Sequence, residues 1–235
     1  MRELQLHHFT QLGGSFGDLQ ESFVQRLSLI KAYLFDWDGV FNDGRKGPRF
    51  DSTFSEPDSM GVNLLRFGHW LRNGTLPATG ILTGEDNPAA EYFSEREHLD
   101  NLYYRCSSKK LALDHFLQSH ELESGEVAFV YDDVIDLDVA EKCGLRFLVR
   151  RKASPAFLDF VKLNSLADYI TYSEGGQHAV REICELMLTA MSIYPDVMHA
   201  RRRYSGAYET YLAARNSIDV TKLSHANASA SALKL

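Results

Sequence analysis

Short apolar segments alternate with segments of helical periodicity along most of this sequence. Strands that are separated by helices need crossover connections, and such connections make neighbouring strands parallel. The pattern therefore predicts an α/β fold, a doubly wound, Rossmann-like parallel sheet with helices on both faces. The apolar runs that predict the strands are 32–35, 78–82, 102–104, 127–131, 145–149 and 169–170.

Capping and breaking residues predict where the intervening helices begin and end. Asp58 or Ser59 can cap a helix that stops at Gly74. Asn87 precedes Pro88, and proline suits the first position of a helix. Further helices are predicted from Ser107 or Ser108 to His120, after 131 to near Gly144, from Ser154 to about Leu163, and over 176–192.

The chain divides into three predicted parts. Residues 1–30 comprise a loose arm followed by a lead-in helix, 31–192 form the α/β domain, and 193–235 form a helical extension with a flexible tail. A weak alternation around Phe50 and Phe54 could form a hairpin.

Bulk properties exclude several classes of protein. Lys and Arg number 25 against 32 Asp and Glu, and the net charge of −7 argues against a nucleic-acid partner. No apolar run approaches the roughly 20 residues that span a bilayer, and the N-terminus does not have the pattern of a secretory signal. Three scattered cysteines favour buried, reduced thiols over disulfides or a zinc site. We therefore expect a cytoplasmic protein with no membrane partner.

Polar residues follow three of the predicted strands. The carboxyl ends of parallel strands meet at one edge of a sheet, which is where ligands bind in open α/β sheets. We therefore expect these side chains to lie together. They are Asp36 and Asp38 after the first strand, Thr83 and Gly84 after the second, and Asp132, Asp133 and Asp136 after the fourth, with Lys110 near the start of a helix.

This set of residue types suits phosphoryl transfer. A carboxylate can attack phosphorus, provided that a hard cation such as Mg²⁺ screens the repulsion between the two anions. A second carboxyl group can protonate the leaving oxygen, while a hydroxyl, backbone N–H groups and a lysine hold the phosphoryl oxygens. Each piece alone is common in turns and helix caps. Their joint occurrence at strand ends favours a functional site.

The same residues resemble the motifs of the haloacid dehalogenase (HAD) superfamily. Asp36-x-Asp38-Gly39-Val40 resembles its first motif, Thr83 its second, Lys110 its third, and Asp132-Asp133-x-x-Asp136 its fourth. The segments 35–44, 58–65 and 174–186 resemble the branch that contains 3-deoxy-D-manno-octulosonate 8-phosphate phosphatase. The resemblance covers about residues 31–190.

The resemblance implies a role for each residue. Asp36 would be the nucleophile, and Asp38 the general acid and base. Asp36, the main-chain carbonyl of Asp38, and Asp132 would bind Mg²⁺. Thr83, Gly84 and Lys110 would hold the phosphate, while Asp133 and Asp136 would support the metal site or Lys110. Members of this branch lack a large cap domain and are typically homotetramers in which a neighbouring subunit closes the active site.

Three departures bear on the substrate, which the resemblance implies to be a sugar-acid phosphate. The branch usually has Arg where this chain has Glu85, Arg-Asp-Gly where it has Pro57-Asp58-Ser59, and Gly where it has Tyr131. Losing two arginines removes partners for an anionic sugar. Two alternatives stay open: a phosphatase for a neutral sugar or nucleotide phosphate, and a non-catalytic paralogue that binds metal.

Other prominent residues have structural interpretations. Trp37 should face the core, and His178 should cap a helix or lie at the rim of the site. The run 150–152 could approach a substrate anion or form a solvent-facing cluster. Tyr204, Tyr208 and Tyr211, at helical spacing, should pack against the domain or a neighbouring subunit.

Overall fold

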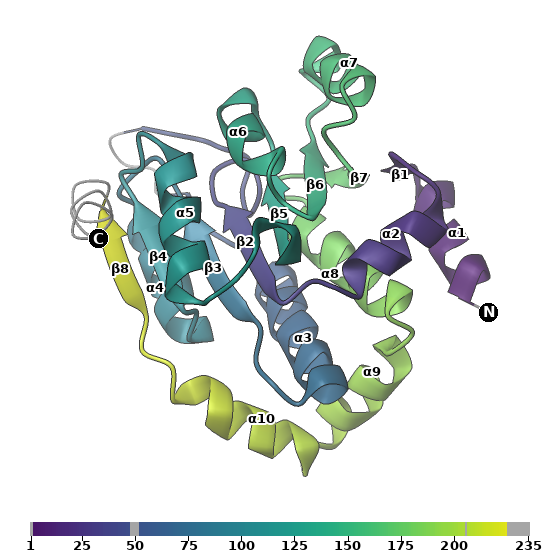
Figure 1. Cartoon of the computed structure of the whole chain (residues 1–235), viewed down its shortest axis with the longest axis vertical. Coiled ribbons are helices and arrows are strands. Elements are labelled where there is room, and N and C mark those ends of the chain that lie inside the picture. Colours follow the sequence, from purple (N-terminus) through teal and green to yellow (C-terminus); the bar gives the residue numbers. More distant parts are fainter. Residues whose placement is uncertain (1, 48–51, 205, 225–235) are drawn as a thin grey trace.

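The strands form one mostly parallel sheet. The computed structural model describes residues 2–47, 52–204 and 206–224. Within them the strand order is β1-β7-β6-β5-β2-β3-β4-β8, and the β1–β7 pair is antiparallel while the other pairs are parallel (Figure 1). The strands are β1 (Ser15–Phe16), β2 (Ala32–Asp36), β3 (Ala78–Leu82), β4 (Asn101–Tyr104), β5 (Val127–Tyr131), β6 (Leu145–Arg150), β7 (Tyr169–Glu174) and β8 (Thr221–Ser224).

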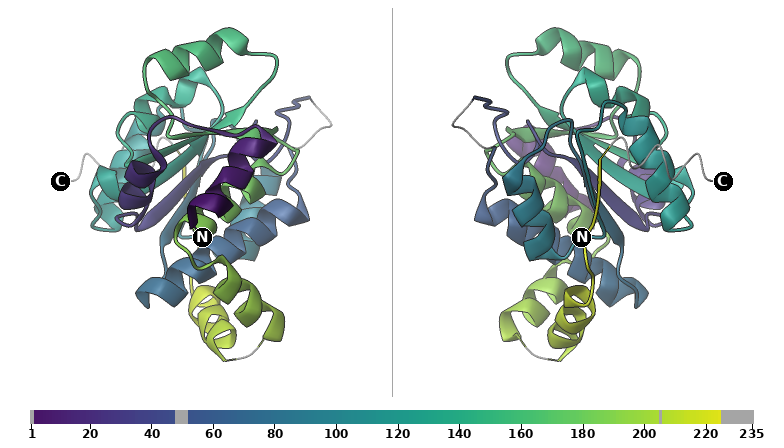
Figure 2. Two further views of the ribbon diagram at one scale, coloured as in Figure 1. Left: turned by 90° about the vertical axis from the view of Figure 1, so that its right-hand side faces the viewer. Right: turned by 90° about the vertical axis from the view of Figure 1, so that its left-hand side faces the viewer.

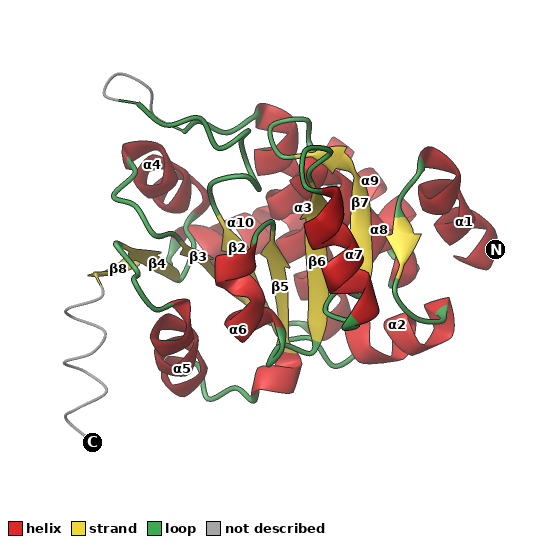
Figure 3. Ribbon diagram, turned by 90° about the horizontal axis from the view of Figure 1, so that it is seen from above, coloured by secondary structure: helices red, strands yellow, loops and turns green. Residues whose placement is uncertain are grey.

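Helices cover both faces of this sheet, as Figure 3 shows from above. Along β2, Tyr33 and Phe35 belong to one apolar cluster, to which α3 and α8 contribute, while Ala32 and Leu34 belong to another, to which α5 and α6 contribute. The doubly wound fold class is therefore confirmed. The helices are α1 (Arg2–Leu12), α2 (Gln20–Leu27), α3 (Glu56–Asn73), α4 (Pro88–Glu97), α5 (Lys109–Ser119), α6 (Leu137–Ala140), α7 (Pro155–Leu163), α8 (Ala179–Ala190), α9 (Tyr194–Arg203) and α10 (Ala207–Asn216).

Local sequence signals predict most boundaries of the central elements. Helix α4 begins after Asn87, whose side chain accepts a hydrogen bond from the amide of Ala89, and α3 ends at Gly74 in the left-handed conformation. The predicted cap of α3 is wrong, because Ser55 rather than Asp58 or Ser59 fills that position. The hydroxyl of Ser55 accepts from the amide of Asp58, and Pro57 fits the first turn.

The N-terminal region contains more structure than predicted. Residues 2–12 form α1 rather than a loose arm, and this helix packs on α8 with Leu6 buried in the core. The segment then adds β1 to the edge of the sheet beside β7 before the lead-in helix α2. Tertiary packing, which a local pattern does not reveal, therefore orders this segment.

The C-terminal extension is helical, as predicted, and it also contains a strand. Helices α9 and α10 lead from α8 around the lower end of the sheet to β8, which pairs with β4 (Figures 1 and 2). Tyr208 and Tyr211 are buried against α3, where their hydroxyls donate to the side chain and the carbonyl of Asn63. These tyrosines therefore pack against the domain itself, whereas Tyr204 is exposed.

Some predictions fall partly outside the described residues. Phe50, half of the possible hairpin, and the predicted flexible tail after Ser224 lie in undescribed segments. No helix in the described part of the chain is both long enough and apolar enough to cross a membrane.

His69 on α3 is a buried imidazole that should make the stability of the fold depend on pH. Its Nδ1 lies 3.2 Å from the hydroxyl of Tyr33. Burial, followed by the charge of Arg72, lowers the pKa of His69 from 6.5 to about 4. The unfolded chain therefore binds more protons than the folded one between these values, so the stabilising contribution is complete above pH 6.5 and is lost as the pH falls toward 4.

We expect His69→Gln, which retains a hydrogen-bonding side chain, to weaken this dependence. The wild-type free energy of unfolding should fall by about 2 kcal/mol more than that of the variant between pH 7.5 and 5. Urea denaturation at the two pH values measures the difference. Parallel losses in the two proteins would contradict the assignment.

Candidate active site

The loop after β2 has a tightly fixed backbone. Asp36 ends the strand, and Trp37 packs in the core as predicted, with its side chain fully buried. Gly39 has φ +84°, a conformation that L side chains rarely adopt. The side chain of Asn42 accepts from the amides of Gly39 (3.4 Å) and Gly44 (2.9 Å) and donates to the carbonyl of Trp37 (3.2 Å). The loop therefore holds its shape through its own hydrogen bonds.

Three buried carboxylates converge at the carboxyl edge of the sheet. They belong to Asp36 on β2, Asp132 just after β5, and Asp136 at the end of the 3₁₀ turn Val134–Asp136. One carboxylate oxygen from each lies within 4.8 Å of the others. The fold therefore brings Asp36 and Asp132 together, as the proposed chemistry requires.

The lysine beside these carboxylates is Lys109, and the prediction of Lys110 is wrong by one position. Lys109 Nζ donates to Asp36 Oδ1 at 2.6 Å and to Asp136 Oδ1 at 2.5 Å. Its side chain is only 4% exposed, whereas Lys110 is exposed. Helix α5 begins at Lys109, and one helical position turns a side chain by about 100°, so only one of the two adjacent lysines can face the site.

The charges in this cluster favour a bound cation. Burial, and then the charge of Asp36, raise the pKa of Asp132 to about 8, and they raise that of Asp136 to about 7 although Lys109 opposes the shift. Burial alone would lower the pKa of Lys109, but Asp36 and Asp136 raise it. Asp136 Oδ2 is buried and has no hydrogen-bond partner in the described residues. Clustered carboxylate oxygens with one unpartnered acceptor fit a hard divalent cation such as Mg²⁺.

The carboxyl group of Asp38 lies apart from this cluster at the rim of the site. Ser52 donates to its Oδ1 at 2.5 Å, and Lys46 Nζ lies 3.5 Å from its Oδ2. Lys46 also pairs with Glu85 at 3.1 Å. Because its side chain is 16% exposed, Asp38 can exchange protons with a bound molecule or water, as an acid and base must. The predicted metal contact of its main-chain carbonyl stays a prediction.

Thr83 and Gly84 follow β3, the strand next to β2. Thr83 is buried, its amide donates to the carbonyl of Tyr103 (2.8 Å), and its hydroxyl accepts from the amide of Glu85 (3.3 Å). Gly84 is exposed. The register pairs Asp36 with Leu82, so Thr83 and Gly84 follow directly after the residue that lies beside Asp36. Their role in holding phosphate stays a prediction.

Arg151 also contacts the site, which sequence reasoning only partly anticipated. It follows β6, and its Nη1 lies 3.1 Å from Asp133 Oδ2 while its Nη2 pairs with Asp132 Oδ2. Asp133 therefore contacts Arg151, and its predicted support of the metal site or of Lys110 stays a prediction. The signal was the position of the basic run 150–152 after a strand, and the structure selects Arg151 from it.

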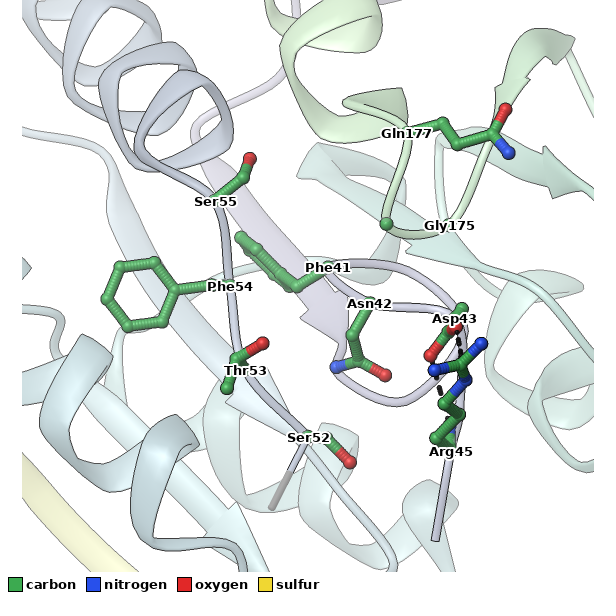
Figure 4. Close-up of a pocket in the computed structure, with 11 residues that line it drawn as sticks. Phe41, Asn42, Asp43, Arg45, Ser52, Thr53, Phe54, Ser55, Gly175 and Gln177 are labelled. Atoms are coloured by element: carbon green, nitrogen blue, oxygen red, sulfur yellow. Dashed lines mark hydrogen bonds and ion pairs between the residues drawn. The ribbon is translucent and has the colours of Figure 1, made fainter. Parts of the chain in front are cut away.

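Gly175 and Gly176 pack against the loop after β2. A Cβ atom on Gly175 would overlap the carbonyl of Gly39 and lie 2.5 Å from that of Asn42. The two loops enclose, together with residues 52–55, a cavity of about 520 Å³ (Figure 4). Ser52 lines this cavity and also donates to Asp38, so the cavity adjoins the rim of the site. His178 lies nearby, 3.0 Å from the hydroxyl of Ser55, in agreement with a rim position.

The residues that depart from the branch pattern, and Asp58 between two of them, have local partners. Asp58, which matches the pattern, is fully buried and accepts from the amide of Arg181 at 2.9 Å. Tyr131 points into the core cluster beneath the site, where its hydroxyl donates to the carbonyl of Leu166 at 2.9 Å. Glu85 pairs with Lys46. Tyr131 therefore fills the core, while Glu85 and Pro57 each stand where the branch has an arginine.

Solved structures of similar fold define the class of protein. A probable YrbI family phosphatase from Pseudomonas syringae is 29% identical, with a TM-score of 0.65 and coverage of 79% of this chain and 99% of that one. A putative HAD superfamily (subfamily IIIA) hydrolase from Legionella pneumophila is 26% identical, with a TM-score of 0.65 and coverage of 78% and 95%. No protein-family model matches the chain. These likenesses support a phosphatase enzyme with the fold of the HAD superfamily hydrolases, and the roles of the individual site residues stay predictions.

Within that class the chain resembles KdsC. It is 28% identical over 181 residues to the 3-deoxy-D-manno-octulosonate 8-phosphate phosphatase KdsC of Escherichia coli K12. The matched residues make up 76% of this chain and 90% of that protein. A Moraxella catarrhalis phosphatase of the same name, solved with magnesium, phosphate and KDO, is 23% identical with a TM-score of 0.62 and coverage of 77% and 99%. At that identity the structural likeness shows the fold alone.

Proposed function

We propose that this protein is a Mg²⁺-dependent phosphomonoester hydrolase that acts on a small sugar-acid phosphate through an aspartyl-phosphate intermediate. The convergence of Asp36, Asp132 and Asp136 at the carboxyl edge of the sheet carries the proposal, because it supplies a nucleophile and metal ligands in one place. The likeness to KdsC supports the substrate class.

In the proposed mechanism Asp36 is the nucleophile. Lys109 holds Asp36 Oδ1 and offsets its charge, and the carboxylate attacks phosphorus while the bond from phosphorus to the sugar oxygen breaks. Asp38 gives its proton to the departing oxygen. Asp38 then takes a proton from a water molecule, whose oxygen attacks phosphorus, releasing inorganic phosphate and restoring Asp36. Asp36, the carbonyl of Asp38, and Asp132 would hold Mg²⁺, with Asp136 beside them, and the ion would screen the phosphate charge.

The remaining residues would position the phosphate and the sugar. Thr83 and the amide of Gly84 would bind phosphoryl oxygens at the end of β3, and Lys109 replaces Lys110 in the proposal. The cavity beside Ser52 and Asn42 is large enough for the sugar. By resemblance to the branch, we also propose a cytoplasmic homotetramer.

A substrate panel tests this proposal. With Mg²⁺ present, we expect hydrolysis of sugar-acid phosphates at a kcat/KM at least about tenfold above that for neutral sugar or nucleotide phosphates, as the likeness to KdsC implies. Chelation by EDTA should abolish turnover, and added Mg²⁺ should restore it.

The two alternatives predict other outcomes of the same panel. A preference for neutral sugar or nucleotide phosphates would favour the first alternative, a phosphatase for those substrates, which the loss of an arginine at Glu85 also supports. Absence of turnover on every phosphoester with Mg²⁺ would favour the non-catalytic alternative.

A further inference from the structure

Arg151 is the counter-ion of Asp132. Lys109 pairs with Asp36 and Asp136, so in the described residues Asp132 has its own cation in Arg151. The side chain of Arg151 is 38% exposed, whereas that of Lys109 is 4% exposed. Lys109 is therefore a fixed charge inside the site, and Arg151 is a charge at its surface that can change partners.

The ion pair lies directly on the loop that carries the nucleophile. A Cβ atom on Gly39 would overlap Asp132 Oδ2 and lie 2.7 Å from Arg151 Nη2. A second cavity, of about 180 Å³, is lined by Gly39, Asn42 and Arg151 among other residues. Arg151 thus reaches Asp132 from open space beside the site.

We propose that Arg151 opposes Mg²⁺ binding by neutralising Asp132, and that it favours anion binding once the metal is bound. The proposal rests on the proposed function and adds to it a residue that couples the metal to the substrate. Arg151 is a positioning residue in this scheme: it acts on the metal through Asp132 and on the anion through its charge.

The balance of charge gives the sign of both effects. When all groups are ionised, the three converging carboxylates and Asp133, which also contacts Arg151, face the two cations Lys109 and Arg151, and the cluster has two net negative charges. Without Arg151 the cluster would have three net negative charges. A more negative site binds a divalent cation more tightly and repels the phosphate dianion more strongly.

Metal affinity provides a test that does not depend on activity. We expect Arg151→Met to bind Mg²⁺ about tenfold more tightly than the wild type in titration calorimetry at low ionic strength. At saturating Mg²⁺, the same variant should bind inorganic phosphate about fivefold more weakly. Arg151→Gln should change both constants in the same directions, and Arg151→Lys should lie between the wild type and Arg151→Met.

Lys152→Met is the matched control. It removes the same charge from the adjacent position, but Lys152 is 73% exposed and its Nζ pairs with Glu174 at 3.1 Å rather than with Asp132. Both binding constants of this variant should stay within about twofold of the wild type.

Several results would overturn the proposal. Equal or weaker Mg²⁺ binding by Arg151→Met and Arg151→Gln would exclude competition for Asp132, and unchanged or tighter phosphate binding would exclude a role toward the anion. Loss of folding in both variants, measured by circular dichroism, would show that Arg151 is required for folding and would reject its proposed role in binding. If the wild-type protein itself bound no Mg²⁺, the proposed function would fail first, so the two failures are distinguishable.

Discussion

Asp36→Asn is expected to lower kcat by about 10⁴-fold or more while the fold survives. The amide cannot form the aspartyl-phosphate, because the nucleophilic oxygen loses its negative charge. Asp36 also contributes to the raised pKa values of Asp132 and Asp136. Lys109 keeps Asp136 as its partner when Asp36 is neutralised, and the repulsion on Asp132 and Asp136 falls, so the metal-free variant should be at least as stable as the wild type. Steady-state kinetics with Mg²⁺ and thermal unfolding in EDTA measure the two effects.

A control carboxylate distinguishes this effect from a general loss of charge. Asp114 on α5 is 48% exposed and pairs with Lys142 at 3.3 Å, away from the three converging carboxylates. Asp114→Asn should have wild-type kcat. Undiminished turnover in Asp36→Asn, with the amide verified by mass spectrometry, would reject Asp36 as the nucleophile.

Lys109→Met is expected to affect both activity and stability. The change removes the cation that contacts Asp36 and Asp136 and leaves two buried carboxylates without it. Removing one partner of a buried ion pair costs about 3–5 kcal/mol. We expect a loss of that size in EDTA, reduced when Mg²⁺ is present, together with a fall in kcat of about 10²-fold or more.

The adjacent Lys110 offers the sharpest comparison for this residue. Lys110→Met removes an identical side chain from the next position of α5, where it is exposed. Its kcat and its free energy of unfolding should match those of the wild type. If Lys110→Met were inactive and Lys109→Met active, Lys110 rather than Lys109 would be the lysine that acts in the site.

The closeness of Asp36, Asp132 and Asp136 illustrates what a local pattern can predict. The period of the apolar runs places β2 and β5 in a parallel sheet, and the carboxyl edge of such a sheet collects whatever follows its strands. The convergence of the carboxylates therefore follows from the strand assignment alone. The prediction of β3 and β5 succeeded because their apolar runs are bounded by residues that disfavour strands.

The terminal elements show where local patterns fail. Strands β1 and β8 are short, and their pairing with β7 and β4 depends on segments far away in the sequence. Helix α1 likewise depends on packing against α8. Long-range contacts of this kind stabilise segments whose own composition favours no single structure.

The amino-acid sequence by itself determined the sheet, its carboxyl edge and the acidic residues gathered there, because apolar periodicity and strand-end position are properties of short segments. Only the tertiary structure decided that Lys109 rather than Lys110 contacts Asp36, and that Arg151 pairs with Asp132. Both choices depend on the direction in which a side chain leaves the backbone. A shift of one residue changes that direction, by about 100° in a helix, and the packing of the whole domain fixes it.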